Sequence, residues 1–320
     1  MTSASRTSLS AAPAAETTTG ETAAPATPAF RGRIGSDVRS GHYPVPHRYR
    51  LFLSPSCPHC LGLAITHSLL DLGDTLPVTL LPAVPDTPDG GYAALRPRYE
   101  AGAHQYRGPA AAPVLGDDWT GRIVSNHAPD ILRDLAERFG AHGPALYPAH
   151  ARDAIDALAH RCERDLAQAA QRAGGLGSDH PGYEAALDTL LGTLAALERR
   201  LADHPYLLGD ELTLADVQLW VDLVQLDTVH RWHLDAAAVQ RIAGHRRLWA
   251  YARRLAARPA FGRHLDLDAI ARRHHARCRG REAAGAAVQI VDWTTAHTLD
   301  TPDTSDTPDT SDRTSAPTVR

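Results

Sequence analysis

The sequence contains no lysine, so all 33 of its basic residues are arginine, and 37 acidic residues outnumber them. The formal net charge of −4 excludes the strongly basic field that proteins use to bind nucleic acid. No apolar run approaches the roughly 20 residues that a transmembrane helix requires, so we predict no membrane association. The first residues also lack an apolar segment, and we therefore expect no secretory signal peptide.

Cysteine is scarce as well. Four cysteines in 320 residues are too few for a disulfide scaffold. We therefore expect a cytoplasmic protein, in which a Cys-X-X-Cys pair is more often redox-active or metal-binding than structural. The chain contains one such pair, Cys57-Pro-His-Cys60.

The two ends of the chain differ from the middle in composition. Residues 1–29 are mainly Ala, Thr, Ser, Pro and Glu, which predicts a disordered N-terminal segment. Residues 295–320 contain a repeated Asp-Thr-Pro-Asp-Thr-Ser unit, which is typical of a solvated, disordered acidic tail. Residues 30–45 form a lead-in to the first domain.

Between residues 46 and 140, strand and helix patterns alternate. The predicted elements are a strand (48–53), a helix (58–72), a second, buried strand (76–82), a long loop (83–110), a hairpin (112–115 and 122–125) and a helix (129–139) capped by Asn126. This order predicts a thioredoxin-like α/β domain. Pro113 falls where that fold has a cis-proline, and cis peptide bonds are essentially confined to proline.

From 147 to 294 the pattern is helical throughout, which predicts an all-α C-terminal domain. The expected helices are 151–170, 183–201, 214–226, 236–256 and 266–278, with a glycine-rich break at 174–177. Thr213 and Asp216 have capping-box spacing at the start of the third helix.

The main chemical signal is Cys57, which follows a turn and begins a helix. A thiol at a helix N-terminus faces free N–H groups and the positive end of the helix dipole, and both favour the nucleophilic thiolate. Pro58 suits the first helical turn because it has no N–H to leave unbonded. Cys60 lies about one turn further on, either as a resolving thiol or as a core filler.

The remaining cysteines carry weaker signals. Cys162 is predicted as a helical core residue and Cys278 as a helix-end residue, because no spacing indicates a partner for either. The chain has no second Cys-X-X-Cys and no His-X3-His at the usual spacing, so we predict no metal site.

The two-domain pattern, with Leu212-Thr-Leu-Ala-Asp216 at a helix start, resembles the glutathione transferase superfamily. Three stretches, Tyr49–Pro58, Ala112–Leu115 and Tyr206–Asp216, are similar to the xi-class enzymes, the glutathionyl-hydroquinone reductases. The resemblance implies a homodimer and a cysteine that attacks the sulfur of a glutathionylated hydroquinone. Cys57 occupies the position of that cysteine.

Several positions depart from the family pattern. The family's Cys-Pro-Trp-Ala is here Cys-Pro-His-Cys, which is similar to the motif of bacterial disulfide oxidoreductases. The Glu-Ser pair that holds the γ-glutamyl end of glutathione is here His127-Ala128, and a pocket tryptophan is replaced by Arg33. The family's active-site tyrosines fall at His230 and His274. We therefore expect glutathione or another low-molecular-weight thiol, with mycothiol as the alternative.

Two sets of candidate residues follow from the resemblance. The candidates for binding the thiol are Pro113, Val114, Ser125, Asn126, His127 and Arg107. The candidates for the substrate pocket are His59, His230, Trp232 and His274. Arg96 and Arg98, in the predicted loop, are further candidates for holding a carboxylate, although solvated loop arginines fit the sequence equally well.

Three functions fit the sequence. The first is a cysteine-dependent thiol reductase or transferase acting on thiol conjugates of quinone-like electrophiles, and it is the one we favour. The second is a dithiol-disulfide oxidoreductase that uses Cys57 and Cys60. The third is a non-catalytic binding module with a transferase fold.

Overall fold

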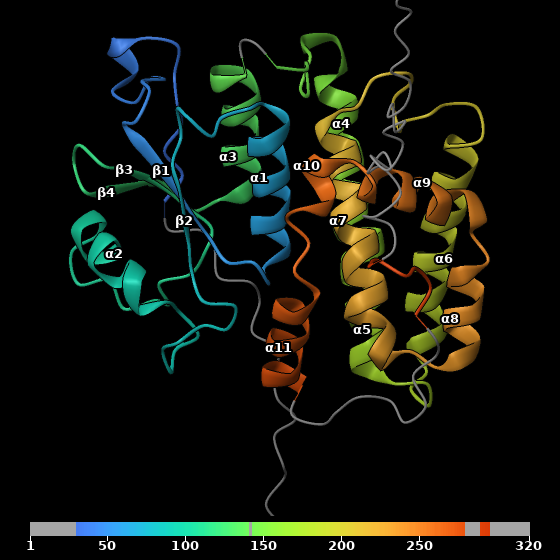
Figure 1. Cartoon of the computed structure of the whole chain (residues 1–320). Helices are drawn as coiled ribbons and strands as arrows, with labels where there is room; N and C mark the ends of the chain where they lie inside the picture. Colours follow the sequence, from blue (N-terminus) through green and yellow to red (C-terminus); the bar gives the residue numbers. More distant parts are fainter. Residues whose placement is uncertain (1–29, 141–142, 279–288, 295–320) are drawn as a thin grey trace, which may run out of the picture.

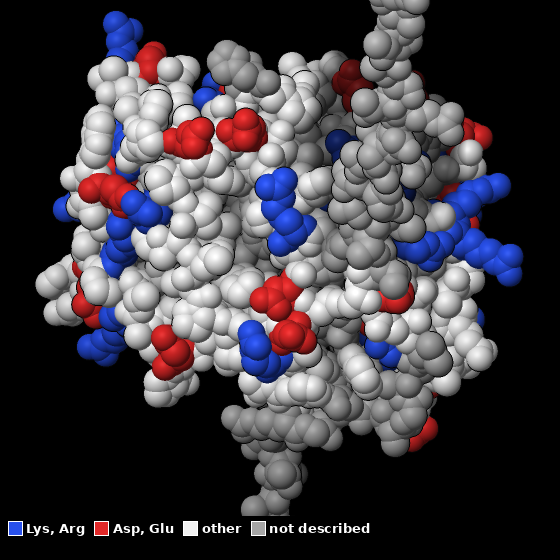
Figure 2. All heavy atoms as spheres, viewed as in Figure 1, with Lys and Arg blue, Asp and Glu red and all other residues white. Residues whose placement is uncertain are grey.

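The computed structural model describes residues 30–140, 143–278 and 289–294, and these residues form a sheet domain and a helical domain (Figure 1). The predicted disordered segments, 1–29 and 295–320, lie outside the described residues. Within the described part of the chain, no helix is long and apolar enough to cross a membrane. Figure 2 shows arginine and acidic side chains interspersed over the viewed face, without a patch of one sign.

The sheet has four strands in the order β2-β1-β3-β4. Their bounds are Tyr49–Leu53 (β1), Val78–Leu80 (β2), Val114–Asp117 (β3) and Arg122–Ser125 (β4). β1 pairs parallel with β2 and antiparallel with β3, and β3 pairs antiparallel with β4. This topology confirms the predicted thioredoxin-like domain.

Helices cover both faces of the sheet (Figure 1). Their bounds are Pro58–Leu69 (α1), Arg96–Gly102 (α2) and Ala128–Asp134 (α3), which continues as a π-helical turn, Leu135–Phe139. Because side chains alternate along a strand, Leu51 and Leu53 face the core shared with α1 and α3. Phe52 faces the other way and packs with residues of the α2 side.

Three details of the sheet domain were predicted wrongly. The expected loop 83–110 contains a 3-10 turn, Ala93–Leu95, and helix α2, which are held by buried Leu95 and Tyr99. The second strand was expected to be buried, but it is an edge strand, and Leu80 is 73% exposed.

The third detail concerns Asn126. The residue that begins α3 as N-cap is His127, and it makes no side-chain capping bond. Asn126 instead accepts a hydrogen bond from the N–H of Phe30 and donates one to the hydroxyl of Tyr99. Its side chain therefore ties the lead-in segment and α2 to the sheet.

The C-terminal domain is helical, as predicted. Its helices are Arg152–Arg161 (α4), Gln168–Leu176 (α5), Tyr183–Arg200 (α6), Leu214–Thr228 (α7), Ala236–Ala243 (α8), Arg246–Ala256 (α9), Pro259–Gly262 (α10) and Leu267–Cys278 (α11). A π-helical segment, Cys162–Ala167 (η5), joins α4 to α5, and 3-10 turns lie at Ala149–Ala151 (η4) and His230–His233 (η6). One more 3-10 turn, Val38–Ser40 (η1), lies in the lead-in segment before the sheet domain.

The boundaries of these helices refine the sequence interpretation. The capping box of Thr213 and Asp216 is present at the start of α7. α5 runs through the first glycines of the expected break and ends at Gly177, whose positive φ of 78° suits glycine. The segment 236–256, expected as one helix, is divided at Gly244 and His245.

The two domains share one hydrophobic core. α1 packs against α7 and α10, and buried residues from both domains form one cluster, whereas the residues on the α2 side of the sheet form a smaller, separate one. Figure 1 shows α11 between the sheet domain and the helices α5 and α7. α11 therefore reaches the region where β1 ends and α1 begins.

Candidate active site

Cys57 is the residue that precedes helix α1, directly after β1 and its turn. Its backbone is extended, at φ −92° and ψ 124°, and Pro58 begins the helix as predicted. The thiol is buried, with 5% of the residue exposed. The Ala112–Pro113 peptide is cis, as predicted, and leads directly into β3, the antiparallel neighbour of β1.

The surroundings of Cys57 lower its pKa to about 5. The largest cause is a hydrogen bond from the thiol of Cys60, and the positive potentials of His59 and Arg273 act in the same direction, whereas burial opposes them. Burial and donation to Cys57 raise the pKa of Cys60 well above its ordinary value. The motif therefore holds one thiolate and one thiol at neutral pH.

Arg273 joins the helical domain to the thiol site. It lies on α11, and its Nη1 donates hydrogen bonds to Oγ of Ser56, at 3.4 Å, and to the hydroxyl of Tyr92, at 3.3 Å. Sequence reasoning missed both Arg273 and Tyr92. Arg273 directly precedes the candidate pocket residue His274 in the sequence, but only the placement of α11 shows that it faces the thiol site.

A cavity of about 490 Å³ opens between the start of α1 and the helices α5, α7 and α11. Ser56, Pro58 and His59 form part of its wall on the sheet-domain side, so the residues on both sides of Cys57 line it. Three of the four predicted pocket residues, His59, His230 and His274, line this cavity.

Trp232, the fourth predicted pocket residue, does not line the cavity. It is 36% exposed, and the guanidinium of Arg231 lies 4.7 Å from the centre of its ring. Its indole N–H donates to the carbonyl of Thr228. The side chain therefore lies on the outside of η6 and away from the cavity, and a role for Trp232 in substrate binding stays a prediction.

His230 is a neutral imidazole at neutral pH. Burial, followed by the nearby His233 and His274, lowers its pKa to about 4. It can therefore accept or donate one hydrogen bond at the cavity wall without adding charge.

The predicted thiol-binding residues bond mainly within the sheet domain, and none of them lines the cavity. Pro113, Val114 and Ser125 are buried, and Oγ of Ser125 accepts the N–H of His127. Nδ1 of His127 lies 2.9 Å from Asp130, which is also 2.6 Å from Nε of Arg31.

The arginine candidates of the loop are not at the cavity either. Arg107 is exposed. Arg96 pairs with Asp89, and Arg98 pairs with Asp118. Arg96 and Arg98 therefore stabilise the α2 region through ion pairs, which differs from the solvated loop arginines that the sequence also allowed.

Two polar residues of α7, buried Asp222 and half-buried Gln225, were missed by the sequence interpretation. Asp222 lines the cavity, and burial, followed by the charge of Glu163, raises its pKa to about 8. Its Oδ1 accepts a bond from Gln218, whereas its Oδ2 and Nε2 of the neighbouring Gln225 have no hydrogen-bond partner among the described residues. They were missed because the many apolar residues of α7 predict a helix that is buried on every side, and such a pattern does not indicate that two of its polar side chains line a cavity.

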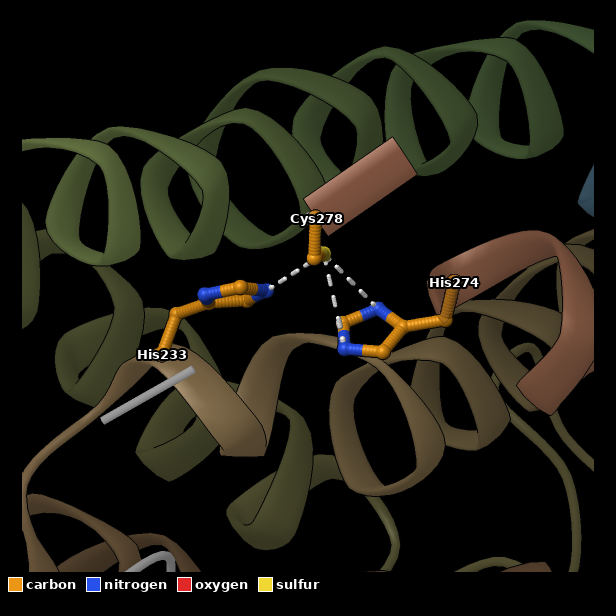
Figure 3. Close-up of side chains that lie close together, drawn as sticks. All are labelled: His233, His274 and Cys278. Carbon is orange, nitrogen blue, oxygen red and sulfur yellow. Dashed lines mark hydrogen bonds between the residues drawn. The ribbon is translucent and has the colours of Figure 1, made fainter. Parts of the chain in front are cut away.

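Cys278 has partners that its sequence context did not indicate. Its Sγ lies 3.3 Å from Nε2 of His233 and 3.4 Å from Nδ1 of His274 (Figure 3). Cys278 is the last residue of α11, as predicted, but it also has partners that no sequence spacing was taken to indicate. The available signal was the His274-X3-Cys278 spacing, which places both side chains on one face of a helix.

Comparisons with known proteins agree with this architecture. Residues 145–254 match the glutathione S-transferase C-terminal domain family. Glutathionyl-hydroquinone reductase PcpF of Sphingobium chlorophenolicum is 30% identical over 234 residues, which cover 68% of this chain and 72% of that protein.

Solved structures give the same result. A glutathione transferase from Gordonia bronchialis superposes with a TM-score of 0.70 at 30% identity, covering 79% of this chain and 84% of the other. The glutathione-bound structure of YqjG, a glutathione transferase homolog from Escherichia coli K-12, superposes with a TM-score of 0.68 at 26% identity, covering 78% and 89%.

Proposed function

We propose a function for this chain from the premise that it belongs to the glutathione transferase superfamily, in the branch of the glutathionyl-hydroquinone reductases. It is a glutathione transferase-like enzyme. Our proposal is that Cys57 is its nucleophile, and that it reduces thiol conjugates of hydroquinones with glutathione or another low-molecular-weight thiol. The observation that carries it is the hydrogen-bonded, low-pKa thiol of Cys57 at the start of α1.

In the first step, the thiolate of Cys57 attacks the sulfur of the conjugate. A sulfur–sulfur bond forms, the sulfur–carbon bond breaks, and the hydroquinone carbon leaves with the electron pair and takes up a proton. The products are the free hydroquinone and a mixed disulfide on Cys57. The conjugate carbon is reduced and the two sulfurs are oxidised.

In the second step, a second thiol reduces the mixed disulfide. A free thiol of the cofactor can attack the cofactor sulfur, which releases its disulfide and restores the Cys57 thiolate. Cys60 is the internal alternative, since it already donates a hydrogen bond to Cys57. In that route Cys60 loses its proton, forms a disulfide with Cys57 and releases the cofactor thiol.

The cavity supplies groups for the aromatic part of the substrate. At neutral pH the carboxyl of Asp222 is protonated, so its Oδ2 and the amide Nε2 of Gln225 are two donors without partners among the described residues, and the hydroxyl oxygens of a hydroquinone can accept from both. Neutral His230 adds a further polar atom to the same wall.

Two thiol cofactors fit the proposal, glutathione and mycothiol. The YqjG structure contains glutathione, which supports glutathione as the first candidate. By the resemblance, His127 and Ala128 stand where the family has its Glu-Ser pair, and Nδ1 of His127 lies 2.9 Å from Asp130. Mycothiol, which lacks a γ-glutamyl group, is therefore the alternative cofactor.

Intact-mass analysis after incubation with glutathione disulfide or mycothiol disulfide tests the proposal. We expect one adduct per chain, on Cys57, with one of the two disulfides, and no adduct in Cys57→Ser. Wild-type protein that forms neither adduct and turns over no thiol-hydroquinone conjugate would contradict it.

A dithiol oxidoreductase is the second candidate function, favoured by the Cys60–Cys57 hydrogen bond. It requires a Cys57–Cys60 disulfide after mild oxidation, which peptide mapping detects. Cys57 adducts that leave Cys60 free would reject it.

We also propose that the enzyme is a cytoplasmic homodimer. The four cysteines are free, and reducing compartments keep thiols in that state. Size-exclusion chromatography with light scattering tests the dimer.

A further inference from the structure

His233, His274 and Cys278 form a compact group of metal-ligating side chains apart from Cys57. One ligand atom from each lies within 4.8 Å of the others. His274 and Cys278 come from the last turns of α11, and His233 comes from η6. Both imidazole rings lie beside the sulfur of Cys278 (Figure 3). We propose that these three residues bind a divalent zinc ion.

The distances suit a tetrahedral site. Zinc–sulfur and zinc–nitrogen bonds of about 2.3 and 2.1 Å, at a tetrahedral angle, separate sulfur from nitrogen by about 3.6 Å. The sulfur of Cys278 lies 3.3 Å from Nε2 of His233 and 3.4 Å from Nδ1 of His274. An ion therefore enters with small rotations of the side chains.

The ligand chemistry selects the metal. One thiolate and two imidazoles suit zinc and similar borderline or soft ions, and do not suit magnesium or calcium, which prefer oxygen. Binding removes the thiol proton of Cys278, which passes to solvent.

The site is built to leave one coordination position open. The three ligands line the same cavity as His59 and Asp222, so the fourth position faces space that water or a small thiolate can fill. Three protein ligands with one exchangeable position are typical of a reactive zinc site, whereas structural sites use four.

Gly174 on α5 makes room for His233. A Cβ added at Gly174 would lie 2.7 Å from Cβ of His233, which is closer than side chains approach. A larger residue at 174 would push His233 away from Cys278. The ligand position therefore depends on a glycine that the helix itself does not require.

Charged residues of both signs surround the site. Glu163 lines the cavity and can offset the charge of a cation. Arg273 and Arg277 line it as well, so the wall of the cavity carries charges of both signs.

Cobalt(II) titration of the untagged, full-length, reduced and chelator-treated protein tests the site, since cobalt(II) reports tetrahedral thiolate coordination by its absorption. We expect one equivalent to bind with a sulfur-to-cobalt charge-transfer band that zinc removes by competition. Cys278→Ser should abolish the band, and His233→Ala should weaken binding at least tenfold. His275→Ala, a change of the exposed neighbouring histidine, should leave binding unchanged.

Two controls separate this site from the reactive cysteines. The band should survive in the double variant Cys57→Ser, Cys60→Ser; its loss there would assign the metal to the Cys-X-X-Cys motif and overturn the proposal. In wild-type protein, zinc should slow the alkylation of Cys278 at least tenfold, as mapped by mass spectrometry. Unchanged alkylation, or no cobalt band, would leave only a hydrogen-bonded cluster and would also overturn it.

Discussion

Cys57 and Cys162 are both buried cysteines on helical segments, 5% and 2% exposed, yet their thiols differ in chemistry. The pKa of Cys57 is lowered to about 5, whereas burial, followed by the charge of Asp222, raises the pKa of Cys162 far above the ordinary range. Cys57 caps a helix N-terminus and receives a hydrogen bond, but Cys162 lies within a continuous helical segment. Local donors and charges, more than burial, decide which thiol becomes a thiolate.

Removing the sulfur of each cysteine should give the largest contrast. Cys57→Ser should lower the turnover of a thiol-hydroquinone conjugate by at least about 10³-fold, because a serine hydroxyl is a far weaker nucleophile toward sulfur. Cys162→Ala should keep turnover within about twofold of wild type, since this thiol is protonated and packed in the core. Equal losses in both variants would remove the distinction between the two sites.

The free energy of unfolding of an Asp222 variant tests the electrostatics of the buried region around Cys162. Its folded-state pKa of about 8 exceeds the ordinary value of 3.8, so its contribution to stability is full below about pH 4 and is lost as the pH rises through about 8. Asp222→Asn should therefore be more stable than wild type at pH 9 by on the order of a few kcal/mol.

Urea unfolding at pH 5 and pH 9 measures this difference. The gain should be larger at pH 9 than at pH 5. Asp179→Asn, a change of an exposed aspartate, should show no such pH-dependent gain. A gain of equal size at both pH values for Asp222→Asn would contradict the burial argument.

Substitution of Cys60 tests whether its hydrogen bond lowers the pKa of Cys57. Wild-type Cys57 should alkylate with a midpoint near pH 5, because the thiolate is the reactive form and its fraction rises through that pKa. Cys60→Ala removes the donor and should move the midpoint upward by at least about one pH unit. Iodoacetamide rates followed by mass spectrometry give both profiles, and an unmoved midpoint would reassign the cause to other groups.

Substitution of Arg273 should have the smallest effect, measured as a change in the alkylation midpoint of Cys57. It acts on Cys57 through charge, behind Cys60 and His59 in size, so Arg273→Gln should raise the alkylation midpoint by less than Cys60→Ala does. Arg272→Gln changes the exposed neighbour on α11 and should leave the midpoint in place. A larger shift of the midpoint in Arg273→Gln than in Cys60→Ala would contradict the conclusion that the Cys60 hydrogen bond is the larger cause of the lowered pKa of Cys57.

Most of the fold could be predicted from patterns that are local in the chain. The period-two and helical repeats predicted β1, α1, the hairpin and the helices of the C-terminal domain, and the Thr213–Asp216 spacing gave a capping box that the structure contains. α2 was missed because Leu95 and Tyr99 gain their helical geometry from packing on the sheet, among glycines and prolines that indicate a loop. The exposure of β2 was missed because an edge strand has the same apolar composition as a buried one.

The candidate site likewise has features that the local sequence could predict and features that it could not. Cys57, Cys60 and cis Pro113 were predictable because a helix start, a four-residue motif and a peptide bond are all local features. The sequence by itself determined the thioredoxin-like order of elements and the position of the Cys57 thiol at the start of a helix.

Only the tertiary structure decided what surrounds that thiol. Arg273 and the group of His233, His274 and Cys278 come from the helical domain, more than 170 residues away from Cys57 along the chain. Their contacts depend on how α11 lies between the two domains. Apolar contacts determine the position of α11, but an apolar pattern in the sequence does not indicate which polar side chains come together there. Non-local packing therefore decides the chemistry of the cavity, whereas local backbone geometry decides that of Cys57.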